Sequence, residues 1–195
     1  MQARSEKTKE RVIRSANALF VKYGLEGVSI QDIAEKSGIS NGSIFHHFGS
    51  KNGVALEVYL RERRTYWDAV IDAVVESRLA PPQAMGEGVR AALRYQEKYP
   101  RRHSFMVECA SADWMCMFAK PIREFLAEAT VRFMVWAEPH IGSGALKPMP
   151  PELYASIIFG MTQYIARSWI TGLTDPKPTS YADDLVAFVE TGFRP

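Results

Sequence analysis

The sequence has few cysteines, no long uncharged hydrophobic run and little net charge. Cysteine accounts for 2 of its 195 residues, which excludes a small domain held together by disulfides. Its 13 glycines and 11 prolines are not periodic, which excludes collagen-like and low-complexity chains. The net charge of +2 is too small to identify a partner, so any functional charge has to be local.

Signals for secretion or membrane insertion are also lacking. The N-terminus, MQARSEKTKERVIRSA, is charged and has no apolar core of the kind that directs export. The most apolar long stretch, residues 153–173, carries Gln163 and Arg167 near its centre, which a membrane-spanning helix of about 20 residues rarely tolerates. We therefore expect a cytoplasmic protein that makes no membrane contact.

What the sequence does have is helical periodicity along most of its length. Apolar residues recur at spacings of three or four, as at Val12, Ala16, Leu19 and Tyr23, and no alternating run predicts a strand. Hydrophobic residues make up 47% of the chain, enough for a core. The pattern predicts helices over residues 6–23, 30–37, 41–48, 51–78, 83–98, 102–118, 121–138, 151–173 and 180–193.

The segment from Ser29 to Phe48 has the pattern of a helix-turn-helix. Ser29, with Asp32 three residues later, predicts a capped helix start, and Gly38 ends that helix after about two turns. Ser40 is placed to cap a second short helix. A short second helix of this kind can enter the DNA major groove, whereas an ordinary helical hairpin is the alternative interpretation.

The second short helix, 41–48, has an outward face suited to DNA. At about 100° per residue, Ile44 and Phe48 share the inward face. The outward positions hold Asn41, Gly42, Ser43 and His46. Phe45 and His47 lie on the two flanks of the helix. No acidic residue lies between Ser37 and Ser50, and an asparagine side chain can pair with adenine.

Groups suited to phosphate surround this helix. Ser29 and Ser40 lie at helix N-termini, where free N–H groups and the helix dipole favour anions. Lys51 lies in the first turn of the next helix, where a phosphate would offset the unfavourable position of its charge. Each basic residue taken alone is as well explained by a solvated surface charge. The N-terminal arm carries more basic than acidic residues: Arg4, Lys7, Lys9, Arg11 and Arg14 against Glu6 and Glu10.

Residues 24–60 closely resemble the N-terminal domain of the tetracycline-repressor (TetR) family. Their sequence is GLEGVSIQDIAEKSGISNGSIFHHFGSKNGVALEVYL. The resemblance rests on the motifs YG…G, SIxxIA, SGIS, GSIFxHF and SK at these spacings, and it covers about residues 8–60. It implies an all-α homodimeric transcriptional regulator, most often a repressor, which a small ligand releases from a palindromic operator.

The resemblance also implies roles for individual residues. Phosphate contacts fall on Ser29, His47 and Lys51, and on Phe45 where the family usually has a tyrosine. Base-edge contacts fall on Asn41, Gly42 and Ser43. The sequence departs from the family pattern twice, because Phe45 lacks the phenolic oxygen and Asn52-Gly53 replaces the usual acidic pair.

Methionine and aromatic residues gather between positions 103 and 136, where they can form plain core or line an adaptable apolar pocket. The resemblance to ligand-responsive repressors favours a pocket for a small apolar or amphipathic ligand. Its predicted lining is Phe105, Met106, Cys109, Trp114, Phe118, Phe125, Phe133 and Met134. Cys109 and Cys116 would be about 10.5 Å apart along one helix, too far for a disulfide, so we expect buried free thiols.

The helix predicted at 151–173 is apolar on several faces, so one core cannot cover all of it. Together with the helix at 180–193, it is predicted to pair with its symmetry mate in a four-helix homodimer interface. The expected partners are therefore a double-stranded DNA operator, a second copy of the chain and a small ligand.

We expect an all-α protein with two parts: a three-helix helix-turn-helix DNA-binding domain at residues 1–53, and a larger helical ligand-binding and dimerisation domain at 54–195. A constitutive DNA-binding regulator without a ligand is the first alternative. A helical enzyme is the second, and His103 near Glu108 is its one candidate pair. The sequence has no Ser-His-Asp order, no zinc-ligand spacing and no phosphate-binding glycine loop. We therefore expect no catalytic residue, no metal and no cofactor.

Overall fold

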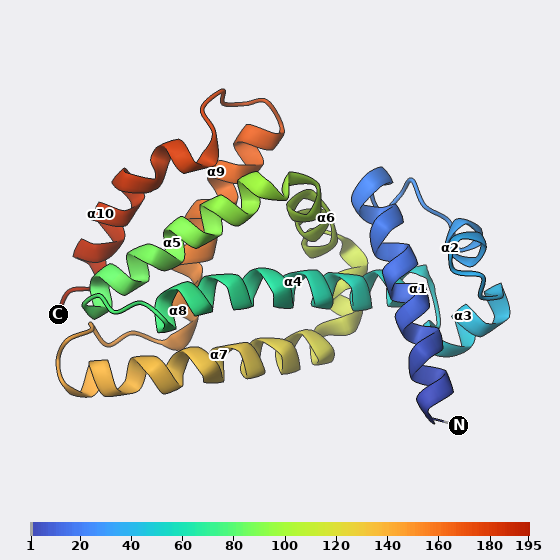
Figure 1. The fold of residues 1–195 in the computed structure, drawn as a ribbon, viewed down its shortest axis with the longest axis horizontal. Coiled ribbons are helices and arrows are strands. Elements are labelled where there is room, and N and C mark those ends of the chain that lie inside the picture. The colour runs from blue at the N-terminus through green and yellow to red at the C-terminus, as the bar shows by residue number, and fades with distance from the viewer. Residues whose placement is uncertain (1) are drawn as a thin grey trace. The chain divides into compact units, whose positions relative to one another are not determined.

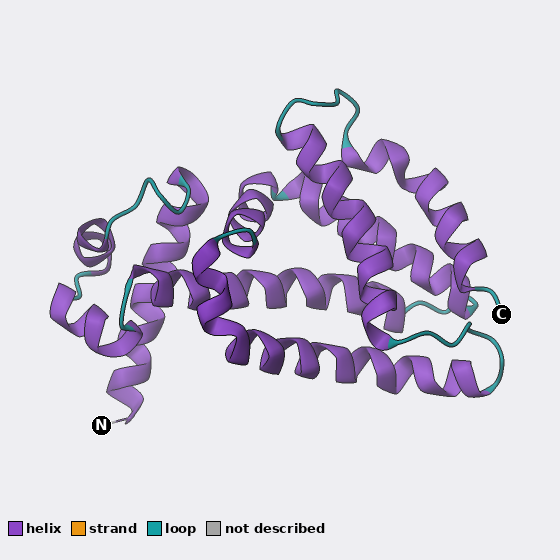
Figure 2. Cartoon of the chain, turned by 180° about the vertical axis from the view of Figure 1, so that it is seen from behind, coloured by secondary structure: helices purple, strands orange, loops and turns teal. Residues whose placement is uncertain are grey.

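The computed structural model describes residues 2–195, so Met1, the first residue of the predicted domain 1–53, lies outside the described residues. Over residues 2–195 the chain consists of helices and loops with no strand (Figure 2), which confirms the all-α prediction. Of the helices in this described part, none is long and apolar enough to cross a membrane. The helices are α1 (Gln2–Tyr23), α2 (Ile30–Ser37), α3 (Asn41–Phe48), α4 (Lys51–Val75), α5 (Pro81–Lys98), α6 (Pro100–Ala110), α7 (Ala119–Gly142), α8 (Pro151–Ala155), α9 (Met161–Ile170) and α10 (Ala182–Phe193).

These helices form two compact units. The first contains the chain up to Arg63 together with Arg101–Ile122, and the second contains Arg64–Pro100 together with Arg123–Pro195. Packing therefore groups α6 with the N-terminal helices, although about forty residues of the second unit separate them in sequence. Helix α4 contributes its first half to one unit and its second half to the other.

The core of the first unit forms where α1, α2, α3 and α6 turn their apolar faces inward. The fully buried side chains include Phe20, Ile33 and Ile44, one from each of α1, α2 and α3. Helix α6 adds Phe105, whose ring stacks on Phe20 with centroids 5.5 Å apart and planes 6° apart. Burial of this kind stabilises by about 1.5–3 kcal/mol per large apolar side chain, so α6 is an integral part of the unit.

Helix α5 is the central helix of the second unit, and α10 lies beside it (Figure 1). Two glycines allow neighbouring helices to approach α5 closely. A Cβ at Gly86 would lie 2.9 Å from Cγ1 of Val186 on α10, and a Cβ at Gly88 would lie 2.7 Å from Cγ2 of Val74 on α4. Larger residues at these positions would therefore push the helices of the unit apart.

Several predicted helix boundaries are wrong: α1 begins at Gln2 and not at residue 6, α4 ends at Val75 and not at residue 78, and three further errors fall between residues 102 and 173. The helix expected at 102–118 ends at Ala110, and a 3-10 helix, Asp113–Phe118, follows in which no residue is fully buried, so no packing supports a continuous helix. The helix expected at 121–138 runs from Ala119 to Gly142. Its Pro121 lies in the first turn, where a proline sacrifices no hydrogen bond. The helix expected at 151–173 contains a π-helical turn at Ser156–Gly160 and ends at Ile170.

Candidate nucleic-acid interface

Helix α2 begins with the reciprocal cap that the sequence predicts. The backbone N–H of Asp32 donates to the Ser29 hydroxyl at 3.2 Å, and the Ser29 backbone N–H donates to the Asp32 carboxylate at 2.7 Å. The Ser29 hydroxyl also donates to that carboxylate at 2.6 Å. These bonds hold the pKa of Asp32 below its usual value, the hydroxyl bond contributing most. The hydroxyl proton of Ser29 is therefore used inside the motif, and its predicted phosphate contact would have to compete with Asp32.

Helix α3 presents the face that the sequence predicts. Ser40 caps it, because the Ser40 hydroxyl accepts the backbone N–H of Ser43 at 3.3 Å, and Ile44 is fully buried. The ring of Phe45 is 48% exposed, unusual for a side chain of its size. The predicted contact residues lie at the surface in two groups, with Asn41, Gly42, Phe45 and His46 exposed and Ser43 and His47 half-buried.

Asn41 is held in place by a residue that the sequence interpretation missed. Its side-chain amide donates to Oε1 of Gln31 at 3.0 Å, and the Gln31 amide in turn donates to Oε1 of Glu35 at 2.9 Å. Both Asn41 and Gln31 are exposed. This bridge from α2 to α3 orients the predicted base-reading amide, and it places a second amide beside it. The signal for Gln31 was its place on the outward face of α2, next to the helix cap.

Lys51 lies in the first turn of α4 and is tied to the loop after α1. Its ammonium donates to the backbone carbonyl of Leu25 at 3.0 Å and lies 3.8 Å from the Glu26 carboxylate. Glu108 of α6 accepts the backbone N–H of the same Leu25 at 3.1 and 3.2 Å. Lys51 therefore fixes this loop, and an ammonium with three donors still has one to offer a phosphate.

The residues predicted to line a ligand pocket are divided between the two units. Phe105, Met106 and Cys109 are buried in the core of the first unit. Trp114 and Phe118 of the 3-10 helix pack edge to face against each other, with centroids 5.8 Å apart. Phe125, Phe133 and Met134 belong to the second unit. One of the eight predicted residues, Phe133, lines the apolar cavity of that unit. Burial raises the pKa of the Cys109 thiol to about 12, and the Cys116 thiol is exposed.

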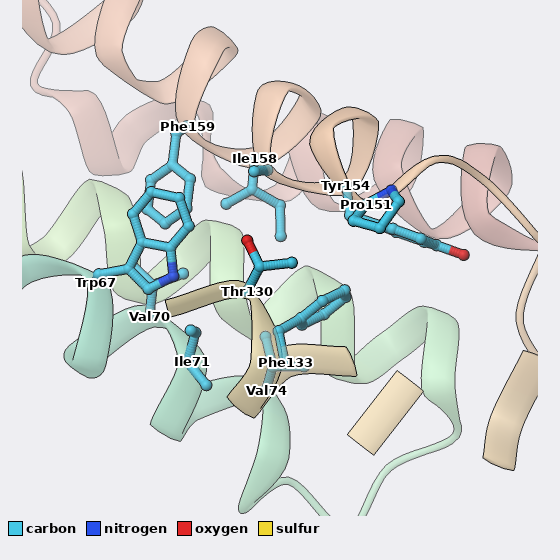
Figure 3. A pocket seen from close by; sticks show the side chains of 11 residues that line it. Trp67, Val70, Ile71, Val74, Thr130, Phe133, Pro151, Tyr154, Ile158 and Phe159 are labelled. Carbon is cyan, nitrogen blue, oxygen red and sulfur yellow. The ribbon is translucent and has the colours of Figure 1, made fainter. Parts of the chain in front are cut away.

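The apolar cavity of the second unit lies between α4, α7 and the α8–π-helical segment. The volume of the cavity that the centre of a water molecule can reach is about 30 Å³, which is enough for one or two waters. Among the described residues that line it, none is charged. The Thr130 hydroxyl points from α7 toward Ile158 (Figure 3). The full lining is Trp67, Val70, Ile71, Val74, Thr130, Phe133, Pro151, Tyr154, Ala155, Ile158 and Phe159.

An aromatic stack forms one wall of this cavity, and ion pairs outside its lining link two of the helices around it. Trp67 of α4 stacks on Phe159 with centroids 4.3 Å apart. Helix α7 is attached to α4 by ion pairs that lie at the surface: Arg64 contacts Glu128 at 2.8 Å, and Arg132 contacts Asp72. Exposed ion pairs contribute at most about 1 kcal/mol each. These ion pairs therefore contribute little to holding α7 on α4, and the apolar contacts of Phe125 with Trp67 and of Phe133 with Tyr154 contribute more.

Large apolar side chains are exposed on the two helices predicted to form a dimer. Tyr164 of α9 is 75% exposed and Phe188 of α10 is 65% exposed. Leu153 is also exposed, and a Cβ at Gly160 would meet nothing within 4 Å in the part of the chain that the structure describes.

In residues 4–195, no group of three histidine, cysteine or acidic side chains is placed to hold a metal ion.

Comparison with known proteins identifies the N-terminal domain. Residues 12–58, which contain α2, α3 and the cap residues described above, match the family of bacterial regulatory proteins called the tetR family. The N-terminal part of the chain therefore carries the helix-turn-helix domain of the TetR family, as its sequence motifs predict. It is 27% identical to the HTH-type transcriptional regulator RutR of Escherichia coli O157:H7, over 81% of this chain and 73% of RutR.

Two further similarities extend along most or all of the chain. It is 27% identical to the probable acrEF/envCD operon repressor of Escherichia coli K12, over 100% of this chain and 90% of that protein. The fold is similar to that of FadR from Bacillus subtilis, a structure determined in complex with stearoyl-CoA. That match has a TM-score of 0.73 at 14% identity and covers 94% of this chain and 98% of FadR. This chain is thus a DNA-binding regulator with a helix-turn-helix at its N-terminus.

The structure explains one departure of this chain from the TetR-family pattern. Gly53, which replaces an acidic residue of the usual pair, is buried in the first turn of α4. A Cβ at this position would lie 1.9 Å from the carbonyl oxygen of Phe48, so the α3–α4 junction as folded here accepts glycine alone. The missing phenolic oxygen of Phe45 has no such compensation in the structure.

Proposed function

We propose that the chain is a repressor that binds a palindromic operator as a homodimer and is released from it by a small apolar or amphipathic ligand. DNA recognition is assigned to residues 1–53, and ligand binding and dimerisation to residues 54–195. The observation that carries the proposal is the exposed face of α3, where Asn41 and Gly42 lie on a helix that has no acidic residue and is anchored by buried Ile44. A helix of this size fits the major groove with its N-terminus first.

DNA binding is tested by comparing one base-reading variant with one phosphate-contacting variant. Asn41→Ala is expected to change the base preference at one operator position by about 1–3 kcal/mol, because an amide pairs bidentately with adenine. Lys51→Gln is expected to weaken binding to every duplex and to reduce the slope of log K against log[salt] by about 0.9. Selection from random duplexes, followed by titration at several salt concentrations, measures both effects.

The two variants also control for each other, because each residue has a different partner in the structure. Lys51→Gln loses the bond to Leu25, so its melting temperature is recorded beside its affinity. If both variants lost affinity equally on every sequence with unchanged salt slopes, the assignment of base and phosphate roles would be wrong. If the intact protein selected no duplex, the proposed function itself would fail.

Ligand release is assigned to the cavity lined by Trp67 and Phe159. A ligand that bound there and widened the cavity would favour a conformer with misplaced recognition helices, and binding to the operator would weaken. FadR, of similar fold, was solved with stearoyl-CoA, which supports an apolar chain as the ligand class. The small volume of this cavity favours the second candidate function, a constitutive regulator without a ligand. Typical ligand pockets have volumes of about 300–1,000 Å³ and are therefore much larger.

Ala155→Phe separates these two candidates. Ala155 is half-buried and lines the cavity, so a phenylalanine there should block it while α3 is left unchanged. Stearoyl-CoA and decanoic acid are the probes. We expect at least one to release the wild-type protein from its selected duplex and to release Ala155→Phe at least tenfold less effectively. Ala127→Phe, at an exposed position of α7, is the matched control and should respond as the wild type does. Unchanged DNA binding by the wild type with both probes would favour the constitutive candidate.

A further inference from the structure

An open groove runs between the N-terminal turns of α1 and helix α3. Basic and hydroxyl side chains line it on both sides, with Arg4, Ser5 and Thr8 from α1 and Ser43, His46 and His47 from α3. The turn between α2 and α3 adds Gly38, Ile39 and Ser40. The volume is about 760 Å³, which is sufficient to admit a segment of sugar–phosphate backbone. The sequence interpretation placed the histidines beside DNA but did not join them to Arg4.

Acidic side chains are kept away from this groove. Helices α1 and α2 carry four carboxylates within residues 4–195, and the groove lining includes none of them. Glu10 is paired with Arg61, and Asp32 is held by Ser29. Glu35 accepts the amide of Gln31, and Glu6 is exposed. An anion in the groove would therefore meet Arg4 and the two imidazoles without a competing carboxylate in the lining.

The walls of the groove are fixed by contacts within the first unit. Arg11 of α1 donates from Nη2 to the backbone carbonyl of Ser37 at 2.7 Å, which ties α1 to the end of α2. Of the remaining charges on the packed helices, Lys36 of α2 lines a different groove and Lys51 of α4 is bonded to Leu25. Among the residues that line the groove, the cations beside the histidines are Arg4 and, when protonated, the histidines themselves.

His46 and His47 lie close together on this surface. Their ring centroids are 5.2 Å apart with planes at 64°, and the His47 ring also packs edge to face on Phe48. Two positive charges held this close repel each other, and an anion placed beside both of them offsets that repulsion. A phosphate between the two helices would remove that repulsion and favour the charged form of each ring.

We propose that this groove seats a phosphate of the operator backbone and that His46 and His47 take up protons when it does, so that DNA binding tightens as the pH falls from about 8 to about 6. The inference rests on the proposed DNA-binding function and adds a regulation to it. For each ring that takes up a proton on binding, the affinity for DNA rises by at most about tenfold for every pH unit by which the pH falls. Affinity rises toward low pH because the complex binds more protons than its separated components.

The experiment compares four proteins on one duplex, selected from a random library by the wild type at about pH 7. The wild-type Kd is expected to fall by on the order of tenfold or more between about pH 8 and about pH 6. His46→Gln should lose at least about threefold of that change, because one of the two protonation sites is gone. His140→Gln, which alters a histidine of α7 in the second unit, should keep the wild-type profile.

Arg4→Gln tests the phosphate directly. This variant should weaken binding at every pH and reduce the slope of log K against log[salt] by about 0.9. His46 and Arg4 are exposed, so both variants should fold, and circular dichroism melting curves verify this. A His46→Gln profile that matched the wild type, or an Arg4→Gln salt slope that was unchanged, would overturn the groove assignment while leaving the proposed function intact. A wild type that bound no duplex would instead remove the proposed function, and this inference with it.

Discussion

The Gly53→Ala variant is expected to lose about 2–3 kcal/mol of folding free energy. The added Cβ would lie 1.9 Å from the carbonyl oxygen of Phe48 and 3.0 Å from its carbonyl carbon, so the clash is with backbone and no rotamer relieves it. The backbone at Gly53 is also held in place, because its N–H donates to the Ser50 hydroxyl at 3.0 Å. The end of α3 and the start of α4 would have to separate.

Thermal and urea unfolding measure this loss, which corresponds to a fall in Tm of roughly 5–10 °C for a chain of this size. Gly192→Ala in α10 is the matched control, because in the described part of the chain a Cβ there would meet nothing within 4 Å. That variant should gain up to about 1 kcal/mol, since alanine favours a helix more than glycine does. A Gly53→Ala protein as stable as the wild type would show that the α3–α4 junction differs from the one described.

The helix-turn-helix could be predicted almost residue by residue because local signals specify it. The Ser29–Asp32 cap, the glycine at position 38 and the Ser40 cap each act within a few residues, and all three are found in the structure. Gly38 has a φ of 64°, a left-handed conformation in which glycine is favoured. The same locality made the buried position of Ile44 predictable, because one inward face of a short helix has few alternatives.

The cavity could not be predicted in this way, because its walls come from distant parts of the sequence. Trp67 and Phe159 are stacked, yet 92 positions separate them along the chain. A high local density of aromatic residues says nothing about which unit each one joins: Phe105 packs on Phe20 in the first unit, whereas Phe133 packs on Tyr154 in the second. Composition indicated that aromatic contacts would dominate the region after residue 100, but not which residues would meet.

The groove between α1 and α3 was missed for a related reason. Arg4 and His46 are 42 positions apart, and only the crossing of two helices brings them to one groove. Periodicity assigns a face to each helix separately and cannot show which faces meet. Gln31 was overlooked likewise, because its bond to Asn41 spans the turn between α2 and α3.

The Tyr164→Glu/Phe188→Glu double variant is expected to convert the proposed homodimer into a monomer. Both side chains are large, apolar and mostly exposed in the single chain, and they lie on the two helices predicted to pair with a symmetry mate. Burying two carboxylates in an apolar interface without partners costs several kcal/mol. A monomer holds one half-site, so operator affinity should fall by roughly 100-fold or more through the loss of the second contact. Sedimentation at micromolar concentration and titration of the selected duplex measure the two effects.

Val135→Glu is the control that separates an interface from a general effect of added charge. Val135 of α7 is 69% exposed, comparable to Phe188, but lies outside the predicted interface. It should leave both the dimer and the DNA affinity unchanged. If Val135→Glu dissociated the protein and the double variant did not, α7 would be the dimerisation helix. If the wild type itself sedimented as a monomer, recognition of a two-fold operator would have to arise on the DNA, with each α3 helix docking independently about one helical turn from the next.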